Sequence, residues 1–201
     1  MKKYIIAIAL TAISFLPIVN TLAQQDEPSD KSDSTVFGKQ LASTDPAVRQ
    51  RAAEELARLV ALDQKKLVEG YLLQEKDKRV RLALSWALYR MGKSQLLFQI
   101  VRELDSSRHD QAVLYLSELE SVDQLYAILK QEDTRPKVVI GIMEVLGRTG
   151  DTEALQQIEP FQTSYDPKIS EAARQAAVMI NDRLSQTQAP AKTRVRSVDK
   201  P

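Results

Sequence analysis

An amphipathic helical pattern recurs about every 30 residues through most of this chain. Its clearest copy begins with Asp45 and Pro46. The Asp45 carboxylate can cap the first turn of a helix, and proline suits the first helical position, where no N–H is needed. Apolar side chains then share one helical face; they are Val48, Ala52, Leu56 and Leu59. The pattern therefore predicts a helix over residues 45–59 that opens a repeated unit.

Four further copies follow, beginning at Asp77, near Asp105, near Arg135 and at Asp166. Successive starts are 32, 28, 30 and 31 residues apart. Each of the first four units has a second apolar segment, which predicts a helix–turn–helix unit. The fifth unit has a first helix only, and Ser34 to Leu41 is predicted as a lone second helix capping the other end. Because one helix pair cannot bury its apolar stripe alone, the pattern predicts an all-α fold, an α-solenoid of about five stacked units.

This pattern resembles the HEAT-like repeats found in phycobilisome lyases and many other bacterial proteins. The stretches that carry the resemblance are DPAVRQRAAEELARL, DKRVRLALSWALYRMG and DPKISEAARQAAVMI. The resemblance covers residues 34–183 and implies a curved stack of helix pairs, usually with the second helices lining the concave face. The third unit departs from the pattern, because Arg108 and His109 stand where an apolar residue belongs. Repeats of this kind indicate a fold and not an activity.

The amino-terminal segment is typical of a secretory signal peptide. Lys2 and Lys3 precede an apolar run from Tyr4 to Val19, which small and polar residues follow. Cleavage is expected after Ala23, which would remove residues 1–23. An uncleaved anchor is the alternative, although the run is shorter than the roughly 20 apolar residues that span a membrane. The protein is therefore predicted to be exported to the periplasm or the outside of a bacterial cell.

Two polar segments flank the predicted repeat domain, which spans residues 34–184. Residues 24–33, QQDEPSDKSD, have no periodicity and are predicted to form a disordered linker. Residues 185–201 are predicted to form a disordered tail, in which the cations outnumber Asp199; these cations are Lys192, Arg194, Arg196 and Lys200. Contact with a membrane is expected only through this basic tail.

The composition excludes several kinds of chemistry. The chain has no cysteine and one histidine, His109, which excludes disulfides, thiolate sites and most imidazole-based metal sites and triads. Asp105 and Asp110 are near His109, but no nucleophile is placed to use such a pair, and a solvent-facing histidine near a helix start is expected. The His–Glu pairs of metal-dependent HEAT-repeat enzymes do not occur in the sequence, and a net charge of +1 does not point to nucleic acid. We therefore predict no enzyme activity, no catalytic residues, no metal, no other cofactor and no small-molecule substrate.

Candidate partner-binding residues lie on the predicted second helices. Phe98 and Tyr126 occupy the same position of their units, and Arg102 and Lys130 follow one turn later on the same face. Stacked side by side, these residues would form an aromatic–basic patch suited to a peptide or an anionic group. Packing between repeats, with the charges solvated, is the favoured alternative.

Two other pairs of equivalent positions are expected to stabilise the stack. Arg49 and Arg81 share a unit position from which each could pair with an acidic side chain of the neighbouring unit. Trp86 and Leu114 share another position, and packing under neighbouring helices is favoured over an exposed outer patch.

Together these patterns predict a non-enzymatic scaffold or adaptor of the bacterial envelope that binds a protein or peptide along its second helices. The alternative is an accessory factor, chaperone-like or lyase-like, that holds a client protein for an enzyme. An accessory factor would change the turnover of its client, whereas a scaffold would only co-purify with it. A third class, a purely structural envelope protein, would be abundant without a discrete partner.

Overall fold

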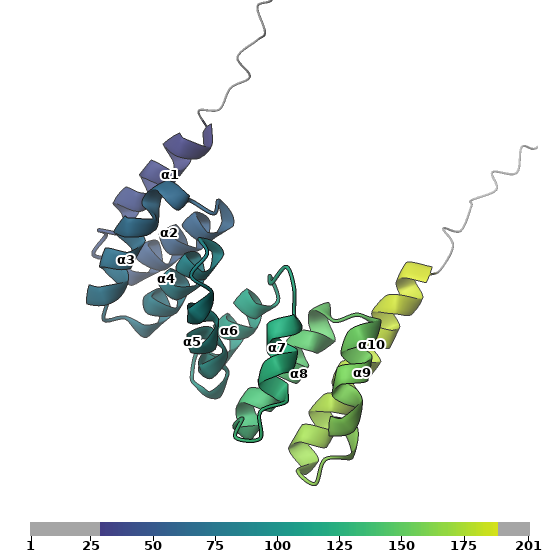
Figure 1. Ribbon diagram of the computed structural model, residues 1–201. Coiled ribbons are helices and arrows are strands. Elements are labelled where there is room, and N and C mark those ends of the chain that lie inside the picture. Colours follow the sequence, from purple (N-terminus) through teal and green to yellow (C-terminus); the bar gives the residue numbers. More distant parts are fainter. Residues whose placement is uncertain (1–28, 189–201) are drawn as a thin grey trace, which may run out of the picture.

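The computed structural model describes residues 29–188, and these form helices and connecting loops without any strand (Figure 1). The predicted all-α class is confirmed. The α-helices are α1 (Ser29–Gln40), α2 (Pro46–Arg58), α3 (Lys65–Gln74), α4 (Lys78–Arg90), α5 (Leu97–Arg102), α6 (His109–Leu116), α7 (Asp123–Leu129), α8 (Pro136–Thr149), α9 (Thr152–Ile158) and α10 (Pro167–Gln188). Short 3₁₀ turns accompany them: η1 (Leu62–Gln64), η2 (Ser94–Leu96), η3 (Glu103–Asp105) and η4 (Glu159–Thr163). The predicted signal peptide and its cleavage site after Ala23 lie outside the described residues, as does most of the predicted tail.

Aspartate caps begin the first helices where the sequence places them. The Asp45 carboxylate accepts a hydrogen bond from the Ala47 N–H at 2.8 Å, at the start of α2. Asp77 caps α4 in the same way through the N–H groups of Arg79 and Val80. Each cap satisfies backbone donors that have no partner within the helix, which fixes where the unit begins.

The first helices pack on one another in chain order, α2 on α4, α4 on α6, α6 on α8 and α8 on α10. The second helices α3, α5, α7 and α9 pack against this row, and one continuous apolar core runs between the two sets. The helices follow an arc, with α1 at one end and α10 at the other (Figure 1). α1 packs against α2 and η1, the position predicted for a capping half-unit.

The two terminal helices are longer than predicted. α1 begins at Ser29, so its first residues lie in the segment 24–33 predicted as a linker, and α10 continues to Gln188, past the predicted boundary at residue 184. Extending an existing helix adds one hydrogen bond for each residue that is ordered, so polar residues can continue a helix that packing has already begun.

Beside α4, the first helices of the first and third units contact each other directly. The Tyr115 hydroxyl on α6 donates a hydrogen bond of 2.6 Å to the Glu54 carboxylate on α2, two units away. Trp86 of α4 lies buried at this point, stacked on Tyr115 with ring centroids 5.5 Å apart. The resemblance implied that the second helices line the concave face; in these three units it is the first helices that converge. Trp86 is packed as favoured, but Leu114, at the equivalent position, is 53% exposed.

Candidate partner-binding site

Two of the four predicted binding residues lie together at a hollow. Phe98 and Arg102 of α5 line a hollow of about 270 Å³ between α5, the α7–α8 loop and the start of α8. The floor is apolar and buried, formed by Val101, Ile128 and Val138. Phe98 stands beside it with 55% of its surface exposed. The arrangement offers an aromatic ring, an apolar floor and a cation to a partner that approaches α5.

The other two predicted residues do not join this hollow. Tyr126 is only 5% exposed, and burial, followed by the nearby carboxylates of Asp151 and Glu153, raises the pKa of its hydroxyl to about 12. Lys130 is exposed but is not part of the hollow's lining. Tyr126 therefore belongs to the core of its unit, and the structure does not form the four-residue patch expected from equivalent positions.

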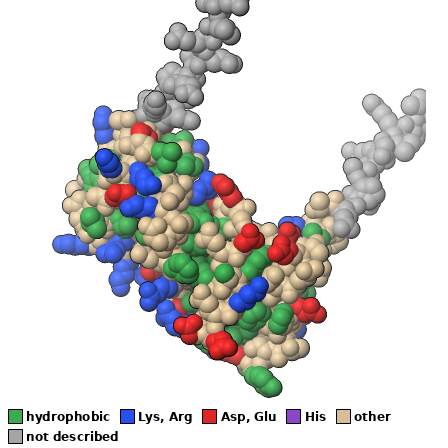
Figure 2. Space-filling view, in the orientation of Figure 1, with side chains coloured by type: hydrophobic (Ala, Val, Ile, Leu, Met, Phe, Trp, Pro, Cys, Tyr) green, Lys and Arg blue, Asp and Glu red, His purple; other side chains and the backbone are tan. Residues whose placement is uncertain are grey.

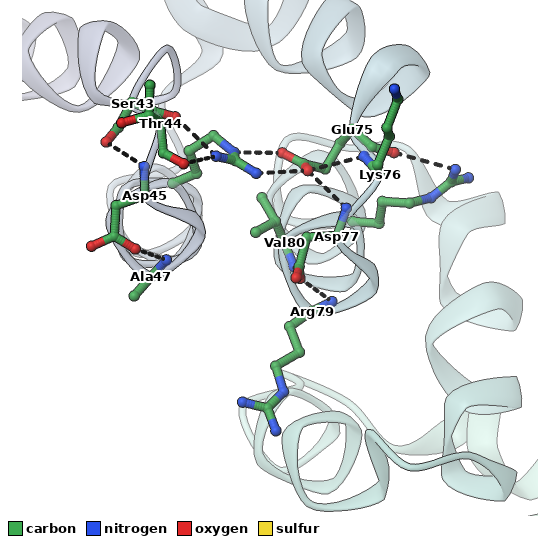
Figure 3. Close-up of polar contacts among 11 residues, drawn as sticks. Ser43, Thr44, Asp45, Ala47, Glu75, Lys76, Asp77, Arg79 and Val80 are labelled. Atoms are coloured by element: carbon green, nitrogen blue, oxygen red, sulfur yellow. Dashed lines mark hydrogen bonds and ion pairs between the residues drawn. The ribbon is translucent and has the colours of Figure 1, made fainter.

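An arginine clasp joins the first two units at the edge where the first helices begin (Figure 3). Arg49 donates to both carboxylate oxygens of Glu75, from Nε at 2.7 Å and from Nη2 at 2.9 Å. Its Nη1 also donates to the carbonyl oxygens of Ser43 and Thr44 in the α1–α2 loop. The predicted structural role of Arg49 is confirmed.

Glu75 is the centre of this clasp. Its side chain is 6% exposed, and it also accepts the backbone N–H groups of Lys76 and Asp77, at 3.0 and 2.9 Å. The hydrogen bonds from Arg49 outweigh burial and lower the pKa of the Glu75 carboxyl. Lys76 and Arg79 project away from the carboxylate on opposite sides (Figure 3). The loop that leads into α4 is therefore held to α2 by a charged and fully bonded carboxylate.

The next unit has the parts of the same clasp. Arg81 occupies the position of Arg49, and Glu103 stands two residues before Asp105, as Glu75 stands two residues before Asp77. A clasp between Arg81 and Glu103 would repeat the first one.

This second clasp is not closed. The Glu103 carboxylate is bound by Arg108, whose Nε donates at 2.6 Å, and by the Ser106 hydroxyl at 2.6 Å. Arg81 donates only a long bond of 3.5 Å to the backbone oxygen of Glu75. The expectation that Arg81 pairs with an acidic side chain is wrong, because Arg108 reaches Glu103 from the loop before α6.

A basic hollow of about 360 Å³ occupies the place of the open clasp. Four cations line it, and Arg108 is the one that is paired, with Glu103. The other three, Lys76, Lys78 and Arg81, form no ion pair among residues 29–188. The remaining lining residues are Leu82, Ser85, Gln99 and Glu103. Ser85 is 5% exposed, and its side chain lines the hollow.

The basic hollow and the Phe98 hollow lie on the two sides of α5. Gln99 lines the first and Phe98, the preceding residue, lines the second. Lys and Arg gather at the lower left of Figure 2, over the amino-terminal helices. Residues 29–105 carry 14 Lys and Arg against 11 Asp and Glu, whereas residues 106–188 carry 8 against 13. The segment KDKRVR, residues 76–81, is the sequence signal that could have indicated this basic hollow.

His109 lies at the start of α6 between two polar partners. Its Nδ1 lies 2.8 Å from the Leu104 carbonyl oxygen and its Nε2 lies 2.8 Å from the Glu144 carboxylate on α8. Burial on its own would lower the pKa of His109, but these two partners together raise it above its ordinary value. The histidine is at a helix start, as expected; it is partly exposed, with 31% of its side chain accessible, and it also connects α6 to α8.

Comparison of the chain with protein-family models found no match, and comparison with curated proteins found none either. Over residues 29–188, none of the helices combines the length and the apolar character needed to cross a membrane. The same part of the chain contains no group of three acidic or imidazole side chains that could hold a metal ion.

Proposed function

We propose that this chain is an α-solenoid of HEAT-like repeats that serves as a non-enzymatic scaffold or adaptor and holds a protein or peptide. The regular spacing of the unit starts and the ordered packing of α2, α4, α6, α8 and α10 support the repeat architecture. A row of helix pairs with one shared core is a rigid platform, and its edges and faces offer a long surface to an extended partner.

Exposure of Phe98 is the observation that carries the binding function. Its equivalent, Tyr126, is buried, so the repeat has no structural need to leave an aromatic ring in water at this position. Exposed aromatic residues beside an apolar floor and an arginine are typical of the few residues that dominate protein–protein affinity. Arg102 supplies that arginine, one turn after Phe98.

The compartment follows from the amino-terminal segment. Lys2, Lys3 and the apolar run up to Val19 support export, with cleavage after Ala23, to the bacterial envelope or beyond. The mass of the protein recovered from the periplasm of its native host tests this. A mature chain beginning at Gln24 is expected, and recovery of the uncleaved precursor from the cytoplasm alone would refute it.

Affinity capture of the full chain from the envelope fraction, followed by mass spectrometry, tests the binding function. Phe98→Ala is expected to lose the captured proteins while it unfolds at the same temperature as the wild type. Leu114→Ala is the matched control, because Leu114 has nearly the same exposure, 53% against 55%, and lies outside the Phe98 hollow. Capture of the same proteins by the wild type and both variants would refute the role of Phe98. An envelope fraction that yields no partner at all would refute the scaffold.

A further inference from the structure

We propose that the basic hollow between α4 and α5 binds a carboxylate of an acidic peptide segment, in place of the intramolecular glutamate that closes the equivalent position one unit earlier. This inference rests on the proposed function and names the chemistry of the partner. Three features of the structure support it: the first clasp, which Glu75 closes; the equivalent place one unit later, where no carboxylate binds the arginine; and a serine hydroxyl that lines the hollow.

The first clasp is the precedent. The arginine at this unit position binds the Glu75 carboxylate through two parallel N–H···O bonds, at 2.7 and 2.9 Å. Such fork-to-fork contacts are the strongest and most selective that a guanidinium makes, and they match the plane of a carboxylate. Arg81 occupies the same position of the next unit. The fold therefore offers the same guanidinium N–H donors at the equivalent place in the second unit.

In that copy no carboxylate binds the arginine, although Glu103 lines the same hollow. Glu103 is held by Arg108 and Ser106 and does not reach Arg81. Lys76 and Lys78 add two further charges to the same hollow. Glu103 and Arg108 also line the hollow and offset each other as an ion pair, so the lining keeps an excess of three positive charges. Like charges held close together repel one another, and an anion that enters the hollow relieves this repulsion.

Ser85 provides an independent indication. It lies on α4 one turn after Arg81, its side chain lines the hollow, and it is buried. Among the described residues, the one fully buried side-chain polar atom without a hydrogen bond is Gln111 Oε1, so the Ser85 hydroxyl is not sealed in the core and stays accessible from the hollow. A carboxylate in the hollow is an acceptor for this donor.

The neighbouring hollow indicates that the anion belongs to a peptide. Phe98 and Gln99 are adjacent on α5 and face the two different hollows. An extended segment that crosses α5 can place an acidic side chain at Arg81 and an apolar side chain against Phe98. The partner is therefore a peptide in which acidic and apolar residues lie close together.

The test uses the full mature chain and fluorescein-labelled peptides of six glutamates or six glutamines, followed by fluorescence anisotropy at about 50 mM salt, where surface charges are weakly screened. The wild type is expected to bind hexaglutamate and not hexaglutamine. Arg81→Ala is expected to raise the Kd by about tenfold or more, as for loss of a charge-assisted contact. Arg51→Ala is the matched control, because Arg51 is exposed on α2, lies outside the hollow and forms no ion pair in the described structure. This variant removes the same charge and is expected to leave the Kd for hexaglutamate unchanged.

Two further variants keep the test independent of folding. Ser85→Ala is expected to weaken hexaglutamate binding with little change in thermal stability. Gln99→Glu puts a carboxylate into the hollow; it is expected to abolish peptide binding and to keep or raise the unfolding temperature, because Arg81 then closes onto it. An unchanged Kd in Gln99→Glu, or equal weakening by Arg81→Ala and Arg51→Ala, would overturn the inference.

Other occupants give different results, each of which overturns the inference. If inorganic phosphate binds with a dependence on Arg81 and hexaglutamate does not, the hollow is a phosphate site. If the wild type sediments as an oligomer and Arg81→Ala as a monomer, a second copy fills it. Envelope partners that remain bound to Gln99→Glu would leave the proposed function intact and refute only this inference. Hexaglutamate binding that depends on Arg81, in the absence of any envelope partner, would instead refute the proposed function and leave this inference intact.

Discussion

Opening the Arg49–Glu75 clasp is the sharpest test of how the units are held together. Arg49→Ala removes both hydrogen bonds to Glu75 and the two bonds to the α1–α2 loop, and it leaves a carboxylate that is 6% exposed with only two backbone partners. Removing one partner of a fully buried ion pair costs about 3–5 kcal/mol, and loss of hydrogen bonds to a charged group costs about 1.5–3 kcal/mol. Since Arg49 itself is partly exposed, we expect a loss of about 2 kcal/mol in the free energy of unfolding.

Circular dichroism at the helical minimum follows this loss directly. For a domain of this size, about 2 kcal/mol corresponds to a fall of about 4–8 °C in Tm. Arg51→Ala on the same helix is the control and is expected to change Tm very little, because Arg51 is exposed and makes no ion pair within the described residues. Arg49→Lys keeps the charge but not the fork, so we expect it to recover less than half of the loss.

The pH dependence separates the ion pair from simple packing. The pKa of Glu75 is lowered in the folded protein, from an ordinary value of 4.5, chiefly by the hydrogen bonds from Arg49. A lowered folded-state pKa contributes stability that is present above 4.5 and disappears as the pH falls through the folded-state value. The difference in Tm between the wild type and Arg49→Ala should therefore be full at pH 7 and shrink below pH 4.5. A difference that stays constant down to pH 3, or a Tm equal to that of Arg51→Ala, would refute the clasp as an ionic contact.

Two other substitutions test the carboxy-terminal half. Gly141→Ala places a methyl group 2.9 Å from the Leu104 side chain, so we expect the free energy of unfolding, measured with denaturant, to fall by about 1–3 kcal/mol. Gly70→Ala on α3, which has open space around it, is the control and should raise that free energy by up to about 1 kcal/mol. Equal effects of the two substitutions would contradict the packing of Gly141 against Leu104. His109→Ala should lower the stability by about 1 kcal/mol at pH 6 and by less at higher pH, because a raised histidine pKa contributes stability that is full below 6.5 and is lost as the pH rises through the folded-state value. An effect that grows from pH 6 to pH 9 would show that the pairing with Glu144 is not ionic.

The units could be predicted from the sequence because their signals are local. An aspartate cap, a proline and apolar residues at helical spacing lie within one segment, as at Asp45 and Asp77, and the helices begin there. The third unit lacks these signals. Arg108 precedes a helix of only eight residues, which begins at His109, after the turn η3, and not near Asp105.

The candidate site could be predicted only in part, because it depends on competition between residues that are distant in sequence. Equivalent positions placed Phe98 and Arg102 on one face, and both line the same hollow, but equivalence could not reveal that Tyr126 is buried in the core of its own unit. The same equivalence suggested a partner for Arg81. That partner, Glu103, is bound by Arg108 instead, and spacing alone does not indicate which of two arginines binds one carboxylate.

The bond between Tyr115 and Glu54 limits how such a chain can change during evolution. In a row of units that contact only their immediate neighbours, a whole unit can be lost or duplicated and the remaining interfaces still fit. Here α6 is tied to α2 over the ring of Trp86, which α4 supplies between them. Deletion of the second unit would remove that ring, and duplication would carry Tyr115 out of reach of Glu54. Loss or duplication of the second unit would therefore break this contact, whereas a change in the number of units beyond α6 would leave it in place.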